Sequence, residues 1–286
     1  MQENIKLLSL NQKAGWGLAD MGIVVFVIVK QLLVLSFMTN YLGVPVAVAG
    51  MVTTGVLLFD ILTDPLIGYL SDRTNTRWGR RAPWMFVGAL ILAAGTVGLF
   101  GVPEALNLTN RILWVSGFFI LATIGFTMVS IPYGATAGEM TQNSEERSVM
   151  MGFRMAFASI GILLGGAVIP QIAGGTREGH LTAAISIAPI MVLAIWTSIW
   201  LTRKTPRVLE PSRESLWEMA SLVWHNTTFM ILVILYGIMT LAIALITAGL
   251  PFAAMYLIKD NGETMLSSVA SGLGILSLMF AAFVLG

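Results

Sequence analysis

The chain of 286 residues has no cysteine and few charged side chains, which make up 11% of the sequence. Without cysteine it has no disulfide framework, no thiolate metal site and no cysteine nucleophile. Charged residues are about a quarter of an ordinary soluble chain, so a water-soluble domain does not fit this composition. The 16 basic and 15 acidic residues nearly cancel, and this balance gives no reason to expect a nucleic-acid partner.

The sequence contains many long apolar stretches. Hydrophobic residues make up 56% of the chain, and the mean hydropathy is +0.83. A transmembrane helix needs roughly 20 mainly apolar residues. The pattern predicts an all-α integral membrane protein in contact with the lipid bilayer, with eight spans at residues 17–41, 44–70, 84–102, 112–138, 149–174, 181–201, 228–257 and 266–286.

Lysine and arginine are distributed unevenly between the two sets of loops. Three of them, Arg111, Arg177 and Lys259, fall on one side of the predicted membrane. Eleven fall on the other side: Lys6, Lys13, Arg73, Arg77, Arg80, Arg81, Arg147, Arg203, Lys204, Arg207 and Arg213. Because basic loops stay in the cytoplasm, we predict that both termini are cytoplasmic and that the protein lies in the cell inner or plasma membrane.

The longest polar segment divides the spans into six and two. It contains Pro206, Pro211 and a helix-start pattern, Ser-x-x-Glu, at Ser215. We therefore predict three regions. These are a six-helix transmembrane bundle over residues 1–201, a cytoplasmic linker with an amphipathic helix over residues 202–227, and a partial second bundle of two helices over residues 228–286.

Five ionisable residues fall within the predicted spans: Asp20, Lys30, Asp60, Asp64 and Arg154. Each costs roughly 2.5 to 3.5 kcal/mol to insert into a membrane and is by default a functional candidate. The alternative for each of them is a structural salt bridge that fixes helix packing.

Asp60 and Asp64 stand four residues apart and so share one helix face. Two carboxylates in a low-dielectric site repel each other unless a proton or a Na⁺ ion lies between them. Pro65 leaves the carbonyl oxygen of Ile61 without its helical partner, which adds an oxygen ligand. The spacing therefore predicts a cation-binding site.

A polar stripe runs along the first span, where Asp20, Val24, Val27 and Gln31 follow a helical period. Together with Lys30, this stripe predicts contact with a small polar organic solute. A polar contact between helices is the alternative for Gln31.

The loop after the second span reads Gly68-Tyr-Leu-Ser-Asp-Arg-Thr-Asn-Thr-Arg-Trp-Gly-Arg-Arg81. It resembles the signature loop of the major facilitator superfamily. The resemblance implies a conformational-switch loop carried by Gly68, Asp72, Arg73, Arg77, Gly79, Arg80 and Arg81.

Within that superfamily, the stretch from Asp60 to Trp84 resembles the glycoside-pentoside-hexuronide cation symporters. Gly15-Trp-Gly-Leu-Ala-Asp-Met-Gly22 and Ser130-Ile-Pro-Tyr133 are similar to the first and fourth helices of that family. The resemblance implies a major facilitator fold of twelve helices in two bundles, with the solute held between them. The present chain would then hold the complete N-terminal six-helix bundle and the first two helices of the C-terminal bundle, as if truncated.

Carried over by position, the resemblance assigns cation binding to Asp60, Asp64 and Thr127, and the sugar pocket to Arg154. In an alignment without gaps, two acids that contact the galactoside in the family's melibiose carrier fall at Val24 and Ser130. The cation half of the site is thus preserved better than the galactoside half. The predicted solute-binding residues are Asp20, Lys30, Gln31, Ser130 and Arg154.

The favoured function is symport of a sugar, a glycoside or a similar polar solute coupled to Na⁺ or H⁺, with no resident cofactor. The alternative is a non-transporting scaffold or assembly subunit, which would have membrane-protein partners. An enzyme is not expected. There is no cysteine, His180 and His225 fall in or near loops, and the single acid pair lies on one helix.

Overall fold

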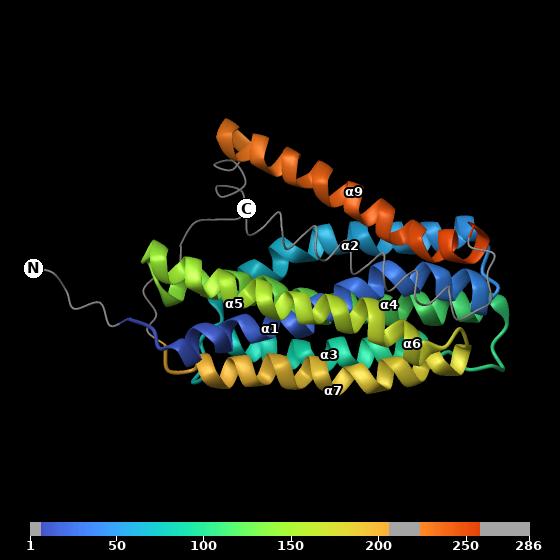
Figure 1. Cartoon of the computed structure of the whole chain (residues 1–286), viewed down its shortest axis with the longest axis horizontal. Helices are drawn as coiled ribbons and strands as arrows, with labels where there is room; N and C mark the ends of the chain where they lie inside the picture. Colours follow the sequence, from blue (N-terminus) through green and yellow to red (C-terminus); the bar gives the residue numbers. More distant parts are fainter. Residues whose placement is uncertain (1–6, 206–223, 258–286) are drawn as a thin grey trace, which may run out of the picture.

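The computed structural model describes residues 7–205 and 224–257, and all regular structure in these ranges is helical. The helices run side by side along the long axis of the molecule (Figure 1). They are α1 (Leu10–Val29), α2 (Val46–Arg73), α3 (Ala82–Phe100), α4 (Leu108–Met140), α5 (Ser144–Leu163), α6 (Ile169–Ala173), α7 (Arg177–Thr202) and α9 (Thr227–Leu257). The described residues also form three π-helical turns. These are η1 (Lys30–Val34) and η2 (Phe37–Tyr41) after α1, and η3 (Leu164–Val168) between α5 and α6.

Seven helices in the described ranges are long and apolar enough to cross a membrane: Leu10–Val34, Val46–Arg73, Ala82–Phe100, Leu108–Met140, Ser144–Ala173, Arg177–Thr202 and Thr227–Ile246. They lie at the first seven predicted spans, and the all-α prediction is confirmed. The predicted eighth span, 266–286, lies outside the described residues. The same holds for residues 206–223, which include the predicted amphipathic helix.

Several helices begin earlier than their apolar stretches. The first helix begins at Leu10 rather than at residue 17, because Ser9 and Gln12 form a capping box in which each side chain accepts from the other's backbone amide. Asn143 caps α5 by accepting from the backbone amide of Glu145. Hydropathy locates the part of a helix that lies in lipid, whereas the caps extend each helix into the polar region.

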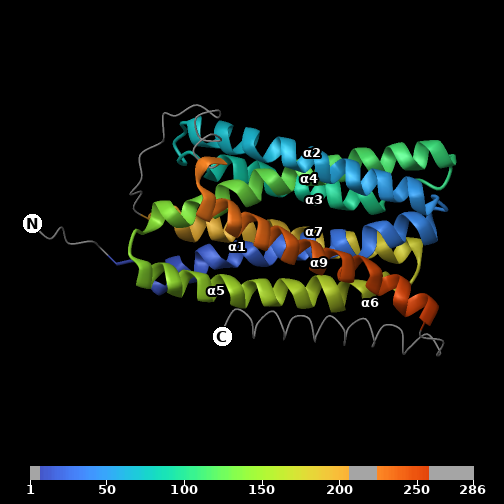
Figure 2. The ribbon, with the colours of Figure 1, turned by 90° about the horizontal axis from the view of Figure 1, so that it is seen from above.

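Six helices pack in the spatial order α5, α1, α7, α3, α4, α2, an arrangement that is visible from above in Figure 2. Glycine permits the closest approaches. A Cβ atom on Gly125 of α4 would lie 2.2 Å from the backbone nitrogen of Leu92 in α3. One on Gly161 of α5 would lie 2.7 Å from the carbonyl oxygen of Met21 in α1. Small residues at such crossings are how membrane helices gain packing energy.

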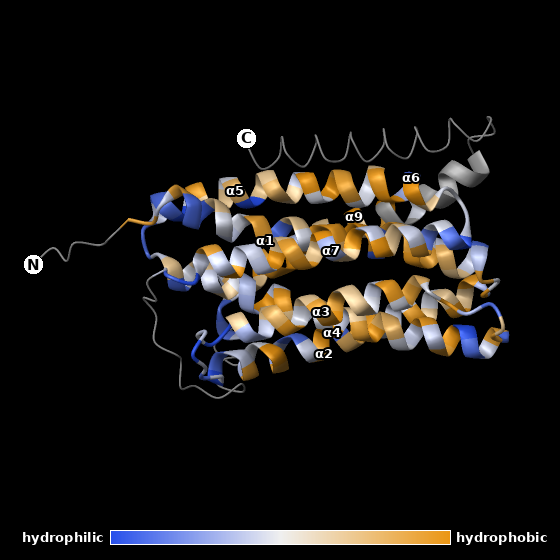
Figure 3. Ribbon diagram, turned by 90° about the horizontal axis from the view of Figure 1, so that it is seen from below, coloured by the Kyte–Doolittle hydropathy of each residue, from blue (hydrophilic) through white to orange (hydrophobic). Residues whose placement is uncertain are grey.

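The helix α9 lies outside this group of six and contacts it at η1 (Figure 1). None of the 18-residue apolar window in Thr227–Ile246 is buried. The helix α2 is also mostly exposed, with apolar side chains such as Leu58 and Leu62 on its surface. Figure 3 shows apolar residues along the outer faces of the helices and polar residues concentrated at their ends. This distribution suits a protein whose lateral surface contacts lipid or other apolar helices.

Candidate functional site

Two carboxylates lie one turn apart near the middle of α2, which runs without interruption through Pro65. Thr127 of α4 donates its hydroxyl hydrogen to Asp60 Oδ1 at 2.9 Å. The Nζ atom of Lys30 lies 3.9 Å from Asp60 Oδ2. The Oδ1 atom of Asp64 is buried and has no hydrogen-bond partner among the described residues. We call Lys30, Asp60, Asp64 and Thr127 the carboxylate cluster.

Lys30 reaches this cluster from the first residue of the π-helical turn η1. A π turn carries an extra residue, which rotates the following side chains relative to a regular α-helix, and such turns occur frequently at functional sites. The ammonium also lies 5.8 Å from the ring centroid of Phe26 and 5.2 Å from that of Phe126. The cluster is therefore built where the first, second and fourth spans meet.

The carboxylate cluster offers hard oxygen ligands from two carboxylates and one hydroxyl. In the described part of the chain, no group of three or more His, Cys, Asp or Glu side chains is arranged to hold a metal ion. The donor set suits a monovalent cation or a proton.

A second polar group lies between α1, α4 and α5. Arg154 Nε donates to Asp20 Oδ2 at 3.1 Å, and the Arg154 guanidinium lies 5.7 Å from the ring centroid of Tyr133. Tyr133 stacks on Trp16 with ring centroids 4.8 Å apart and planes at 18°. We call Trp16, Asp20, Tyr133 and Arg154 the arginine cluster.

The arginine cluster combines a charged pair with an aromatic pair. The side chain of Arg154 is 34% exposed, whereas that of Asp20 is 5% exposed. Tyr133 is buried, and its hydroxyl has no hydrogen-bond partner in the described ranges. Buried polar groups without a hydrogen-bond partner are uncommon in folded proteins.

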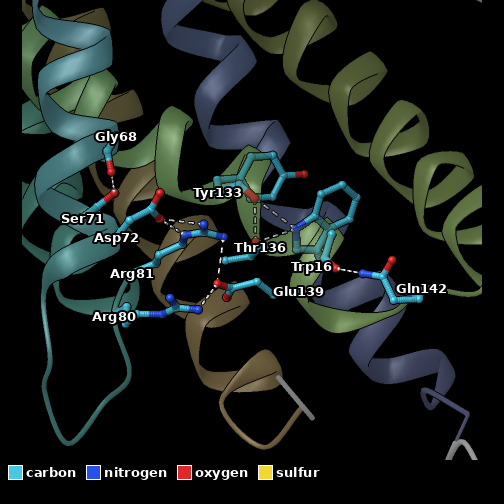
Figure 4. Close-up of polar contacts among 11 residues, drawn as sticks. Trp16, Gly68, Ser71, Asp72, Arg80, Arg81, Tyr133, Thr136, Glu139 and Gln142 are labelled. Atoms are coloured by element: carbon cyan, nitrogen blue, oxygen red, sulfur yellow. Dashed lines mark hydrogen bonds and ion pairs between the residues drawn. The ribbon is translucent and has the colours of Figure 1, made fainter. Parts of the chain in front are cut away.

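The predicted switch loop is held by ion pairs at one end of the bundle (Figure 4). Arg81 bonds Asp72 Oδ1 through Nη2 at 2.7 Å, and its Nη1 atom lies 3.3 Å from Glu139 Oε1. Arg80 Nη2 bonds the same Glu139 oxygen at 2.6 Å. The loop turns at Gly79, whose φ of +92° favours glycine. These contacts tie α2 and the start of α3 to the end of α4.

The remaining loop residues play smaller parts. The Arg73 guanidinium lies 4.1 Å from the ring centroid of Tyr69, and Arg77 is exposed. A Cβ atom at Gly68 would lie 3.4 Å from the Ile131 side chain, which is an ordinary van der Waals distance.

The structure separates the residues that were predicted to bind the solute. Asp20 and Arg154 meet, whereas Lys30 lies with Asp60 in the carboxylate cluster. Gln31 and Ser130 are partly exposed, and neither bonds to a member of the two clusters within the described chain. Their assigned roles stay predictions.

Three residues of these networks were not singled out as site residues from the sequence: Trp16, Tyr133 and Glu139. Trp16 and Tyr133 stand inside stretches that resemble the symporter family, and Glu139 lies further along the same helix as Tyr133. An aromatic or acidic residue within such a stretch is the signal that could have identified them.

A bundle of membrane-length helices with charged side chains packed inside it is typical of an integral membrane protein. The chain belongs to the family described as MFS/sugar transport protein, which its residues 15–285 match.

Named relatives support this membership. An uncharacterized symporter of Synechocystis sp. is 33% identical over 72% of this chain and 40% of its own length. A putative glycoside/cation symporter of Escherichia coli is 27% identical over 69% of this chain and 44% of its own length. A putative sulfoquinovose importer of Salmonella typhimurium is 27% identical over 66% of this chain and 41% of its own length. The chain thus spans less than half the length of these relatives.

Proposed function

We propose that this chain belongs to a symporter that couples the entry of Na⁺ or H⁺ to the entry of a sugar, a glycoside or a similar polar solute. The observation that carries the proposal is the carboxylate cluster, in which Asp60 and Asp64 face Thr127 from a neighbouring helix. Burying carboxylates at membrane depth costs free energy, and a bound cation offsets that cost only while it is present. Cation binding can therefore drive a change of conformation.

The carboxylate cluster and the arginine cluster have different roles in this proposal. The cation binds at the carboxylate cluster, and the solute binds beside Arg154 in the arginine cluster. Both clusters draw residues from the first span, which supplies Asp20 and Lys30, and from α4, which supplies Thr127 and Tyr133. A small rotation of either helix changes both clusters at once, which is the reciprocal coupling that symport requires.

The names of the relatives guide the choice of solute. Glycosides and sulfoquinovose are both hydroxylated sugars, and the second carries a sulfonate. Arg154, partly exposed and paired with Asp20, can bond to hydroxyl groups in either and to an acidic group in the second. A screen should therefore include neutral glycosides and acidic sugars.

The distribution of lysine and arginine supports cytoplasmic termini in a cell inner or plasma membrane. On this orientation the loop network of Asp72, Arg80, Arg81 and Glu139 lies on the cytoplasmic side. It would stabilise one position of the bundle during alternating access. We prefer this function to a non-transporting scaffold, because a scaffold does not require a buried carboxylate oxygen such as Asp64 Oδ1, which has no hydrogen-bond partner among the described residues.

The test is solute uptake into proteoliposomes driven by an imposed Na⁺ or H⁺ gradient. Asp60→Asn and Asp64→Asn should each abolish gradient-driven uptake, while exchange of solute without a gradient survives, because the solute is held mainly by other residues. The matched control is Glu145→Gln, which neutralises an exposed acid outside both clusters. Normal gradient-driven uptake by both Asn variants would rule out the proposed cation site.

A further inference from the structure

The ammonium of Lys30 lies where a monovalent cation would be stabilised. It faces Asp60 Oδ2 at 3.9 Å and lies over the rings of Phe26 and Phe126. A carboxylate oxygen and two aromatic faces each attract positive charge, and they do so more strongly away from water. The side chain of Lys30 is 20% exposed and that of Asp60 is 13% exposed. The ammonium is therefore a tethered counter-ion of Asp60.

The two carboxylates differ in what they offer to a further cation. On Asp60, Oδ1 accepts the bond from Thr127 and Oδ2 faces Lys30. On Asp64, Oδ1 is buried with no hydrogen-bond partner in the described ranges. Because two positive charges at one oxygen repel each other, a metal ion that binds both carboxylates must first displace Lys30 from Asp60.

This argument rests on the symport function proposed above and extends it to the choice of ion. We propose that Lys30 determines the affinity of the carboxylate cluster for Na⁺ by competing with the ion for Asp60. In the native protein Na⁺ binds weakly, because the ammonium already neutralises one of the two carboxylates. Without the ammonium, both carboxylates are available to the metal ion, and it binds more tightly.

A purely structural salt bridge between η1 and α2 would behave differently. Removing such a bridge lowers the thermal stability in every salt and leaves the response to Na⁺ unchanged. Competition instead predicts that removing the ammonium destabilises the protein chiefly in the absence of Na⁺, and that added Na⁺ restores the stability by binding the folded state. The dependence on Na⁺ is thus the readout that separates the two roles.

The experiment compares the native protein with Lys30→Gln and Lys30→Met, which remove the charge, and with Lys30→Arg, the matched control that keeps it. The proteins are purified in detergent at high NaCl concentration and then desalted, so that both neutral variants have their best chance to fold. Thermal unfolding is followed over a series of NaCl concentrations, with choline chloride holding the ionic strength constant. The measured quantity is the NaCl concentration that gives half of the maximal stabilisation.

We expect this concentration to be at least tenfold lower in a neutral variant than in the native and Lys30→Arg proteins, which corresponds to about 1.4 kcal/mol in binding free energy. An equal or higher concentration in the neutral variants, or no response to Na⁺ in any of the four proteins, overturns the proposal. The symport function is judged separately by uptake in Asp64→Asn. The symport function is supported if Asp64→Asn loses uptake driven by a proton gradient. This outcome does not depend on whether Lys30→Gln responds to Na⁺.

Discussion

Arg154 donates its Nε hydrogen to Asp20 across 3.1 Å and so joins α5 to α1 between residues 134 positions apart in the chain. A buried ion pair gains little net stability, because both charges lose water. Losing one partner is far more costly, since the other charge is then left uncompensated. The intact pair therefore adds little net stability, whereas breaking it leaves a charge without its partner.

The first prediction concerns this pair. Asp20→Asn leaves the guanidinium of Arg154 without its carboxylate and should lower the free energy of unfolding. Because the Arg154 side chain is 34% exposed, we expect a loss of about 1–2 kcal/mol rather than the 3–5 kcal/mol of a fully buried pair. The measurement is thermal unfolding in detergent. The double variant Asp20→Asn/Arg154→Gln should recover part of the loss, and a double variant less stable than the single one would contradict this account.

The second prediction concerns the crossing of α3 and α4. In Gly125→Ala the new Cβ atom would meet the backbone of Leu92 at 2.2 Å, so the two helices must separate. We expect a loss of about 3 kcal/mol, at the upper end for overpacked sites. The matched control on the same helix is Gly117→Ala, where a Cβ atom meets nothing within 4 Å. The control should be neutral or up to about 1 kcal/mol more stable. Equal melting temperatures for the two variants would contradict the packing described here.

Much of this fold was predictable, because a membrane span is recorded in a continuous stretch of sequence. The pairing of Lys30 with Asp60 could also be anticipated, since a buried ammonium needs an acidic partner. Contacts between distant helices were harder to foresee, because they depend on how each helix is rotated about its axis. The π turn that begins at Lys30 changes that rotation, and helical periodicity gave no sign of it.

The ion pairs of Glu139 are a second example of contacts that the sequence did not predict. Its two arginine partners, Arg80 and Arg81, were expected to act within the switch loop. The sequence contains no local pattern that connects a loop after α2 with the last turn of α4. The packing of α2 and α3 against α4 brings them together.

The third prediction concerns the hydroxyl of Tyr133, which is buried with no hydrogen-bond partner in the described chain. Tyr133→Phe removes a group that contributes no described bond, so the melting temperature in the absence of solute should stay the same or rise. If the hydroxyl bonds the solute, the apparent affinity for solute should fall up to about tenfold. Equilibrium binding and thermal unfolding of the same preparation give both values. A fall in melting temperature with unchanged affinity would assign Tyr133 a structural role only.

The last prediction separates two threonines that lie one turn apart on α4. Thr127 donates to Asp60 Oδ1 at 2.9 Å, whereas the Thr123 hydroxyl is buried without a hydrogen-bond partner among the described residues. Both residues are fully buried, so replacement by valine, which is nearly isosteric, changes little except the hydroxyl. Thr127→Val should weaken cation binding by about 0.5–1.5 kcal/mol, or roughly twofold to tenfold, because one neutral ligand is lost.

Thr123→Val should leave cation binding unchanged and should keep or raise the melting temperature, because an unpaired buried hydroxyl is removed. Cation titrations of thermal stability, run in parallel on the two variants and the native protein, provide the comparison. The same shift in both variants would mean that packing on α4, rather than the bond to Asp60, controls the cation. Weaker cation binding in Thr127→Val alone would show that the Thr127 hydroxyl contributes to the carboxylate cluster. It would also show that α4 takes part in the cluster through this hydroxyl.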